Sequence, residues 1–410
     1  MKKHLFISLC LLHAVCQLMA ASPTGIYTST INSDILGEER TLFISVPAKY
    51  EENTHHYPVV YVLDADFLFD ITRSITQLRA ARNYMPESII VGLPNTWRQR
   101  FQGAANWKLP NGQKFFNPPG NPKTFLKFIK QELIPHIEQN YRTNTHRSVI
   151  GLSPTTGPVF EALWSEQGLF KAHVALAIAV DMVDESDLSI ADKLLTSILD
   201  ETQPPGTSVY VGIAGNDVTK RPERGQGFAD INKQLKAHPN PHVNYRIEII
   251  PDEEHYGMAV PGLQHAFELI YPRHLWNVNY ATFWDSPSPA QAIQAHYETL
   301  SKHHGFKIIP LQDGYFASHN LLGVGRRLSN QKRFQERLDM FRLGLQYYPN
   351  SAPLYEGLAE SYLALNQPEK ALEAGQKAVQ LGIRFQHADL NYYRETLQTI
   401  ENHNSKEKKP

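Results

Sequence analysis

Ser153 lies in the stretch VIGLSPTTGP, where a short apolar run gives way to a helical pattern. A serine hydroxyl is nucleophilic at neutral pH only if a neighbouring base takes its proton, and that base needs an orienting acid. His255 and Asp217 are the candidates, because each follows a later apolar run with the composition of a strand. The chain order serine, acid, histidine, each at a strand end, predicts a catalytic triad. Asp181 and Glu254 are the alternative acids.

The residues around Ser153 depart from the usual pattern of such a turn. Residues two before and two after the serine must be small; Gly151 meets this requirement, whereas Thr155 does not obviously do so. The residue after the nucleophile normally donates its backbone N–H to the oxyanion, and Pro154 has none. Loss of one such donor costs roughly 10²–10³ in turnover. One possibility is that the hydroxyl of Thr155 or Thr156, or the N–H groups of the next helix, replace the missing oxyanion donor. The other is that the chain is an impaired hydrolase that acts as a binding or scaffold protein.

The elements that must position these residues alternate between short apolar runs and longer helical patterns, from about Gly25 to Pro272. Continuous apolar runs of this kind are typical of strands buried on both faces of a parallel sheet. The pattern predicts a doubly wound α/β sheet. The predicted strands are 41–47, 57–63, 88–93, 148–150, 172–179, 208–213 and 245–250, and the predicted helices are 69–83, 122–141, 157–167 and 228–238.

The chain resembles the putative-esterase family of α/β-hydrolases, which includes enterochelin and other siderophore esterases. The residues that carry the resemblance are VVYVLDADFLF, IIVGLPNTWRQR, HRSVIGLSPTTGPVFEALWSEQGLFKAHVALA and IIPDEEHYGMAVPGLQHAFELIY, within about Leu36 to Tyr271. The family usually has Ser-x-Gly-Gly where this chain has Ser153-Pro-Thr-Thr. The resemblance implies a serine hydrolase acting on carboxylic esters, of siderophore type or other small esters, without a cofactor. It gives Ser153, Asp217 and His255 the roles of nucleophile, acid and base.

The resemblance also implies a substrate side of the site. Ala65 and Asp66 lie where the family places a backbone donor of the oxyanion hole. Asn95, Arg98 and Arg100 begin a long loop, 95–119, that is rich in Asn, Gly, Pro and aromatic residues. A long irregular loop after a strand is often functional, and its cations would meet an acidic or catechol-like substrate. The alternative is a solvated loop.

A Pro/Ser-rich break at 284–289 ends the predicted hydrolase domain, which spans 22–283. Residues 284–317 are predicted to form a linker and a first helix. Residues 318–402 repeat small and apolar positions with a period of about 34, which resembles tetratricopeptide repeats. Such repeats form concave binding surfaces, so we expect a protein or peptide partner; alternatively, these helices cover the hydrolase domain or form a dimer. A disordered tail is predicted for 403–410, and the oligomeric state is left open.

The N-terminus reads MKKHLFISLCLLHAVCQLMAASP, with a basic start, a short apolar run and small residues near Ala21. This pattern predicts a signal peptide over 1–21 and a periplasmic or secreted protein. A membrane anchor and lipidation at Cys16 are weaker alternatives. Both cysteines of the chain, Cys10 and Cys16, lie in this segment, so the mature protein would contain no disulfide. A net charge of -1 argues against a nucleic-acid partner, and no metal-ligand spacing or stable membrane span is apparent.

Overall fold

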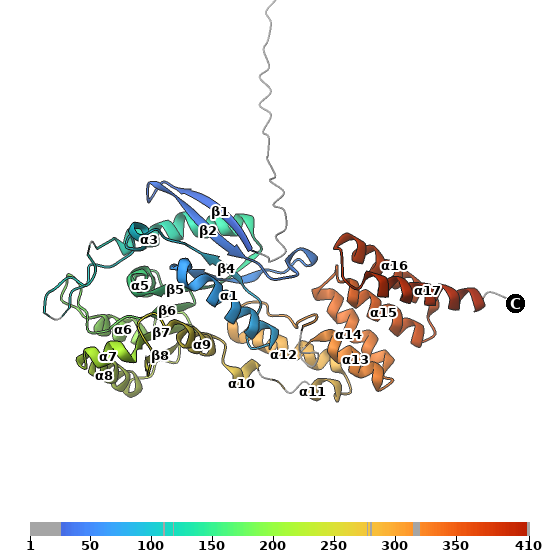
Figure 1. The fold of residues 1–410 in the computed structure, drawn as a ribbon. Helices are drawn as coiled ribbons and strands as arrows, with labels where there is room; N and C mark the ends of the chain where they lie inside the picture. Colours follow the sequence, from blue (N-terminus) through green and yellow to red (C-terminus); the bar gives the residue numbers. More distant parts are fainter. Residues whose placement is uncertain are drawn as a thin grey trace, which may run out of the picture.

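The computed structural model describes residues 26–109, 111–117, 119–276, 278, 281–314 and 320–407 (Figure 1). The predicted signal peptide, including Cys10 and Cys16, lies outside the described residues.

The central element is an eight-stranded sheet with the strand order β1-β2-β4-β3-β5-β6-β7-β8. From β4 to β8 neighbouring strands are parallel, whereas β1, β2 and β4 pair antiparallel at one edge. All residues of β3, β6 and β7 are buried, as expected for strands covered on both faces. The strands are β1 Ile26–Ser33, β2 Glu38–Ser45, β3 Tyr57–Val62, β4 Ile89–Gly92, β5 Thr143–Leu152, β6 Ala172–Leu176, β7 Thr207–Ala214 and β8 Val243–Ile250.

Helices cover both faces of the sheet, and each face has its own hydrophobic core. In α9 the buried residues Leu263, Phe267 and Ile270 follow helical spacing, which gives the helix one apolar face. The first core takes residues from α3 Pro122–Phe128, α4 Ile134–Asn140, α5 Thr156–Ser165, α6 Ile190–Leu199 and α8 Glu223–Ala237. The second takes residues from α1 Ala65–Ala81, α9 Ala259–Ile270 and the C-terminal helices. The predicted α/β fold is confirmed. The remaining elements are short: α2 Trp97–Arg100, α7 Gly215–Lys220, α10 Arg273–Trp276, α11 Ala281–Trp284, 3₁₀ turns at Tyr50–Glu52 and Ser153–Thr155, and one π-helical turn at Ile129–Leu133.

The C-terminal part is helical, and its successive helices from α13 to α17 pack on one another (orange to red in Figure 1). Gly325 and Gly357, from two different helices, both lie against the ring of Phe341, where a β-carbon would come within 2.3 or 2.4 Å of that ring. The tetratricopeptide assignment stays a prediction. The helices are α12 Pro289–His304, α13 Leu321–Asn330, α14 Phe334–Tyr347, α15 Ala352–Ala364, α16 Pro368–Arg384 and α17 Leu390–Glu407.

The end of the chain differs from the prediction of a disordered tail after residue 402. Helix α17 continues through Glu407, and the buried Ile400 anchors its last turns to the second core. Residues 408–410 lie outside the described residues. A sequence rich in Lys and Glu is compatible with helix when one face of that helix is already packed.

Candidate active site

Ser153 stands in a sharp turn between β5 and α5. Its backbone has a φ of +56°, in the left-handed region that non-glycine residues seldom adopt and that costs about 1–3 kcal/mol. Gly151 makes the turn possible, because a β-carbon there would lie 2.3 Å from the carbonyl oxygen of Thr155. Thr155 itself is accommodated: its hydroxyl accepts a hydrogen bond from the Leu152 N–H at 2.8 Å and donates to the Leu152 carbonyl at 3.1 Å. The turn is a nucleophile elbow in geometry, despite its unusual residues.

The three residues of the predicted triad lie in contact at the carboxyl ends of their strands. The Oγ of Ser153 lies 3.1 Å from Nε2 of His255, and Nδ1 of His255 lies 2.6 Å from Oδ2 of Asp217. Asp217 is in the first turn of α7, directly after β7, and His255 is in the turn between β8 and α9. Among the described residues, neither alternative acid, Asp181 or Glu254, contacts the ring of His255 through a hydrogen bond or ion pair.

The electrostatic surroundings keep Asp217 ionised. Partial burial favours the neutral carboxyl, but the hydrogen bond and charge of His255 and the nearby cations Arg224 and Lys220 outweigh it, so the pKa of Asp217 lies below its ordinary value. An ionised acid at Nδ1 fixes the proton on that nitrogen and leaves Nε2 free to accept the proton of Ser153. This arrangement is suited to nucleophilic attack on an acyl carbon.

The threonine hydroxyls that the sequence analysis offered as replacement oxyanion donors are already hydrogen-bonded to the backbone. Pro154 has no N–H, and the Thr156 hydroxyl donates to the carbonyl of Ser153 at 2.7 Å. The Thr155 hydroxyl is equally engaged, with Leu152. The two residues predicted to offer a backbone donor after β3, Ala65 and Asp66, lie in the first turn of α1, and the N–H of Ala65 donates to the carbonyl of Leu93 at 3.2 Å. Neither threonine hydroxyl is therefore available to replace the missing N–H in this arrangement.

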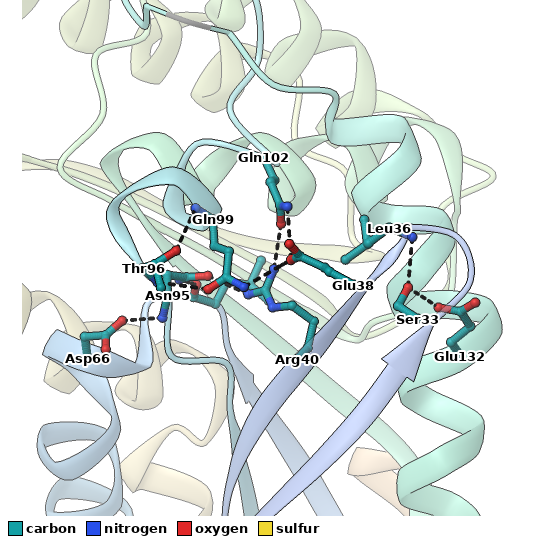
Figure 2. Close-up of polar contacts among 11 residues, drawn as sticks. Ser33, Leu36, Glu38, Arg40, Asp66, Asn95, Thr96, Gln99, Gln102 and Glu132 are labelled. Carbon is teal, nitrogen blue, oxygen red and sulfur yellow. Dashed lines mark hydrogen bonds and ion pairs between the residues drawn. The ribbon is translucent and has the colours of Figure 1, made fainter.

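Asn95 is held by the protein rather than turned toward solvent (Figure 2). Its side-chain amide donates to the Leu63 carbonyl at 2.7 Å, and its backbone N–H donates to Asp66 at 2.5 Å. Its side-chain oxygen accepts a hydrogen bond of 2.6 Å from Arg40. These contacts attach the start of the 95–119 loop to the end of β3 and the first turn of α1.

Arg40 is fully buried on β2, and sequence reasoning did not single it out. Besides Asn95 it donates to Gln102 at 2.7 Å and contacts Glu38 at 3.4 Å (Figure 2). Burial lowers the pKa of Arg40, although Glu38 opposes the shift, and an arginine stays charged under either influence. A signal was present: by the period of two, Arg40 shares its strand face with Leu42, which is fully buried, so an inward-facing arginine was to be expected there.

Arg100 is likewise committed to protein partners. Its guanidinium lies 2.8 and 3.0 Å from Oδ2 of the fully buried Asp64 and donates to the Tyr256 hydroxyl at 3.3 Å. Burial raises the pKa of Asp64 to about 6, with Arg100 pulling in the opposite direction. Arg98, by contrast, is exposed. Of the two loop cations predicted to meet a substrate, only Arg98 points to solvent.

Large aromatic side chains stand exposed at this edge of the sheet. Phe67, Trp97 and Tyr256 are 50%, 76% and 49% exposed, respectively. Phe67 and Tyr256 stack with parallel rings 5.6 Å apart, and Trp97 lies edge-on to Phe101 at 4.9 Å. Exposed aromatic rings of this size commonly mark binding surfaces. Tyr256 also lies edge-on to the ring of His255, with centroids 4.9 Å apart, so the stacked pair places apolar, planar surface beside the triad.

Metal-binding clusters and membrane-spanning helices are both absent from the described residues. These residues contain no group of three or more His, Cys, Asp or Glu side chains that could hold a metal ion. In the same residues, no helix combines the length and apolarity needed to cross a membrane.

The part of the chain that contains Ser153 is similar to a known protein family. Residues 33–164, from the last residue of β1 into α5, match the family described as Putative esterase. The predicted resemblance to the putative-esterase family is confirmed. This family match contains Ser153, the segment after β3 and the 95–119 loop, whereas Asp217 and His255 lie beyond it. A search of curated proteins found no match.

Solved structures resemble this fold over most of the chain. An IroE-like serine hydrolase from Shewanella oneidensis aligns with a TM-score of 0.61 and 23% identity, covering 78% of this chain and 98% of that one. An uncharacterised protein from Capnocytophaga ochracea DSM 7271 aligns with a TM-score of 0.55 and 15% identity, covering 92% and 99%. The BES protein from Bacillus cereus aligns with a TM-score of 0.50 and 18% identity, covering 66% and 99%. At these identities the likeness establishes the fold of the putative-esterase part and leaves the chemistry to the site.

Proposed function

We propose that this protein is a serine hydrolase acting on small carboxylic esters. The observation that carries the proposal is the continuous hydrogen-bonded chain from Ser153 through His255 to Asp217. The esterase-family match and the serine hydrolase from Shewanella oneidensis support the same reaction class. The exposed aromatic rim favours esters with a planar or apolar group, which includes siderophore-type esters.

The mechanism follows from the positions of the three side chains. His255 takes the hydroxyl proton through Nε2 as Oγ of Ser153 forms a bond to the ester carbonyl carbon. The tetrahedral intermediate expels the alcohol, which receives that proton from His255, and leaves an acyl group on Ser153. Water, deprotonated by the same imidazole, then attacks the acyl carbon. The second tetrahedral intermediate releases the acid as the imidazolium returns the proton to Oγ of Ser153. Asp217 remains ionised throughout and stabilises the imidazolium.

The opposing hypothesis is a binding or scaffold protein with an impaired hydrolase site, whose C-terminal helices contact a partner. The observation in its favour is that Pro154 lacks an N–H, while the hydroxyls of Thr155 and Thr156 are both hydrogen-bonded to backbone groups. One missing donor is worth roughly 3–4 kcal/mol, against a total catalytic effect of about 8–23 kcal/mol. The loss therefore weakens a hydrolase without abolishing it, which favours the enzyme.

The test is turnover of p-nitrophenyl acetate together with fluorophosphonate labelling. We expect a burst of nitrophenol, labelling at Ser153, and a loss of about 10⁴-fold or more in Ser153→Ala and His255→Ala. Ser165→Ala is the matched control, because that serine lies at the end of α5 and bonds only to the Glu161 carbonyl among the described residues. Unlabelled Ser153, or a Ser153→Ala variant with full activity, would favour the binding-protein hypothesis.

We also propose that the protein is exported, on the basis of the N-terminal sequence. Cell fractionation of the tagged full-length chain, with N-terminal sequencing of the product, tests this. Cleavage near residue 21 and recovery outside the cytoplasm are expected, whereas an uncleaved cytoplasmic chain would contradict export.

A further inference from the structure

The tetrahedral intermediate of the proposed reaction carries a negative oxygen that needs hydrogen-bond donors. Two backbone N–H groups usually serve, one from the residue after the nucleophile and one from the loop after β3. Pro154 removes the first, and the two threonine hydroxyls beside it are engaged with backbone groups. The Thr156 N–H also donates to the Ser153 carbonyl. A side-chain donor from another element would supply the bond that Pro154 cannot make.

Tyr256 presents such a donor. Its hydroxyl oxygen accepts a hydrogen bond from Nη1 of Arg100 at 3.3 Å, so its own hydrogen points elsewhere. Among the described residues that hydrogen finds no protein acceptor, and the side chain is half exposed. A phenol that accepts a hydrogen bond from a guanidinium becomes a stronger donor, because the cation withdraws electron density from its oxygen.

A series of contacts fixes the position of Tyr256 relative to Ser153. Ser153 lies against His255, and the rings of His255 and Tyr256 have centroids 4.9 Å apart. The Tyr256 hydroxyl meets Arg100, which pairs with Asp64 at the end of β3. Strand β3 lies beside β5, which leads back to Ser153. The tyrosine thus spans the space between the catalytic histidine and the loop after β3, where the second oxyanion donor of such sites is found.

The ring of Tyr256 is held from the other side as well. It stacks on Phe67, in the first turn of α1, with parallel rings whose centroids are 5.6 Å apart. The guanidinium carbon of Arg100 lies 5.0 Å from the centre of the Phe67 ring and 5.5 Å from that of Tyr256. Two aromatic rings and one ion-paired cation therefore fix the hydroxyl before a substrate arrives, as electrostatic catalysis requires.

We infer that the Tyr256 hydroxyl is an oxyanion donor of this site and takes the place of the backbone N–H that Pro154 lacks. This inference rests on the proposed serine-hydrolase function. As the bond from Ser153 Oγ to the acyl carbon forms, the π electrons of the carbonyl move onto its oxygen. Tyr256 donates a hydrogen bond to that oxygen and keeps its proton, while His255 carries the serine proton to the leaving alcohol.

The test is a double-mutant cycle between Tyr256→Phe and Pro154→Ala, measured as kcat and KM for p-nitrophenyl acetate. Tyr256→Phe keeps the stacked ring and removes the hydroxyl, so we expect kcat to fall about 10²-fold with little change in KM. With the backbone N–H restored by Pro154→Ala, the same change is expected to cost roughly tenfold less. Tyr245→Phe, in the middle of β8, is the control for loss of a tyrosine hydroxyl elsewhere.

Several outcomes would overturn the inference. One is a Tyr256→Phe enzyme whose kcat stays within about threefold of the wild type; another is an equal cost in both backgrounds. Thermal unfolding of each variant identifies a folding defect, and Pro154→Gly serves as a second means of restoring the N–H if Pro154→Ala does not fold. An inactive Ser153→Ala beside a fully active Tyr256→Phe would reject the tyrosine and keep the hydrolase. A fully active Ser153→Ala would reject both.

Discussion

The ion pair of Asp64 and Arg100 affects both the stability of the fold and the position of a residue beside His255. Asp64 is fully buried, and its Oδ1 has no hydrogen-bond partner among the described residues. Burial of an imperfectly satisfied carboxylate is costly, and Arg100 offsets only part of that cost. The same arginine holds Tyr256, so the pair joins the loop after β3 to the loop that carries His255.

This pair predicts a pH dependence of stability. Burial raises the pKa of Asp64 to about 6, above the roughly 3.9 of an unfolded chain, so the native state holds this proton more tightly. The stabilisation is fully present below pH ~4 and is lost as the pH rises through about 6, for a total of about 3 kcal/mol. Arg100→Met removes the compensating cation, and its free energy of unfolding should fall more steeply between pH 5 and pH 8 than that of the wild type. Urea titrations at both pH values measure this; parallel losses would contradict it.

At the scale of the element, the turn between β5 and α5 depends on Gly151. A β-carbon there would lie 2.3 Å from the Thr155 carbonyl oxygen and 2.9 Å from Val159. Because neither backbone nor buried core can yield cheaply, Gly151→Ala should lower the free energy of unfolding by about 1–3 kcal/mol and displace Ser153, with a large fall in esterase turnover. Gly314→Ala is the control, since the nearest atom to its added β-carbon among the described residues, in the Asn320 side chain, is 4.0 Å away. An unchanged kcat in Gly151→Ala would show that the turn tolerates the clash.

The elements that the sequence analysis predicted are those with a strong local pattern. The strands ending before Ser153, Asp217 and His255 are continuous apolar runs, and the structure places all three residues at one edge of the sheet. Strand β1 was missed because IYTSTINS is an edge strand with few apolar residues. Helix α6 was also missed, although Ser189 and Asp192 form a capping box that announces its start.

The contacts that connect distant elements had no comparable local signal. Asp64 and Arg100 are 36 residues apart, and Arg100 and Tyr256 are 156 apart, so only the folded topology brings them together. The same holds for the pairing of Arg40 with Asn95 across 55 residues. The sequence analysis left a substrate-binding loop and a solvated loop open for Asn95 and Arg100, because a long polar loop gives no indication of which side chains turn inward.

At the scale of the whole molecule, the helical part is joined to the esterase part through a shared interior. The second hydrophobic core runs without interruption from Leu263 of α9 to Leu354 of α15. A buried hydrogen bond of 2.9 Å links Tyr297 of α12 to Asn83 after α1. Contacts between the rings of His55 and Tyr348 and between those of His146 and Phe306 extend the junction. The C-terminal helices therefore cover one face of the esterase part, in agreement with one of the alternatives that the sequence left open.

This shared core predicts that the two parts unfold together. In the full chain we expect one urea transition, with coincident midpoints for near-UV and far-UV circular dichroism, because the apolar surface of each part is buried by the other. A chain that ends at residue 284 should aggregate or melt well below the full protein, since it exposes the apolar face under α12. A chain that ends at residue 387 removes only α17 and serves as the milder truncation. Two separated transitions would contradict this prediction, as would a chain ending at residue 284 that melts at the temperature of the full chain. Either result would show that the helices form an independent domain that is available to bind a partner.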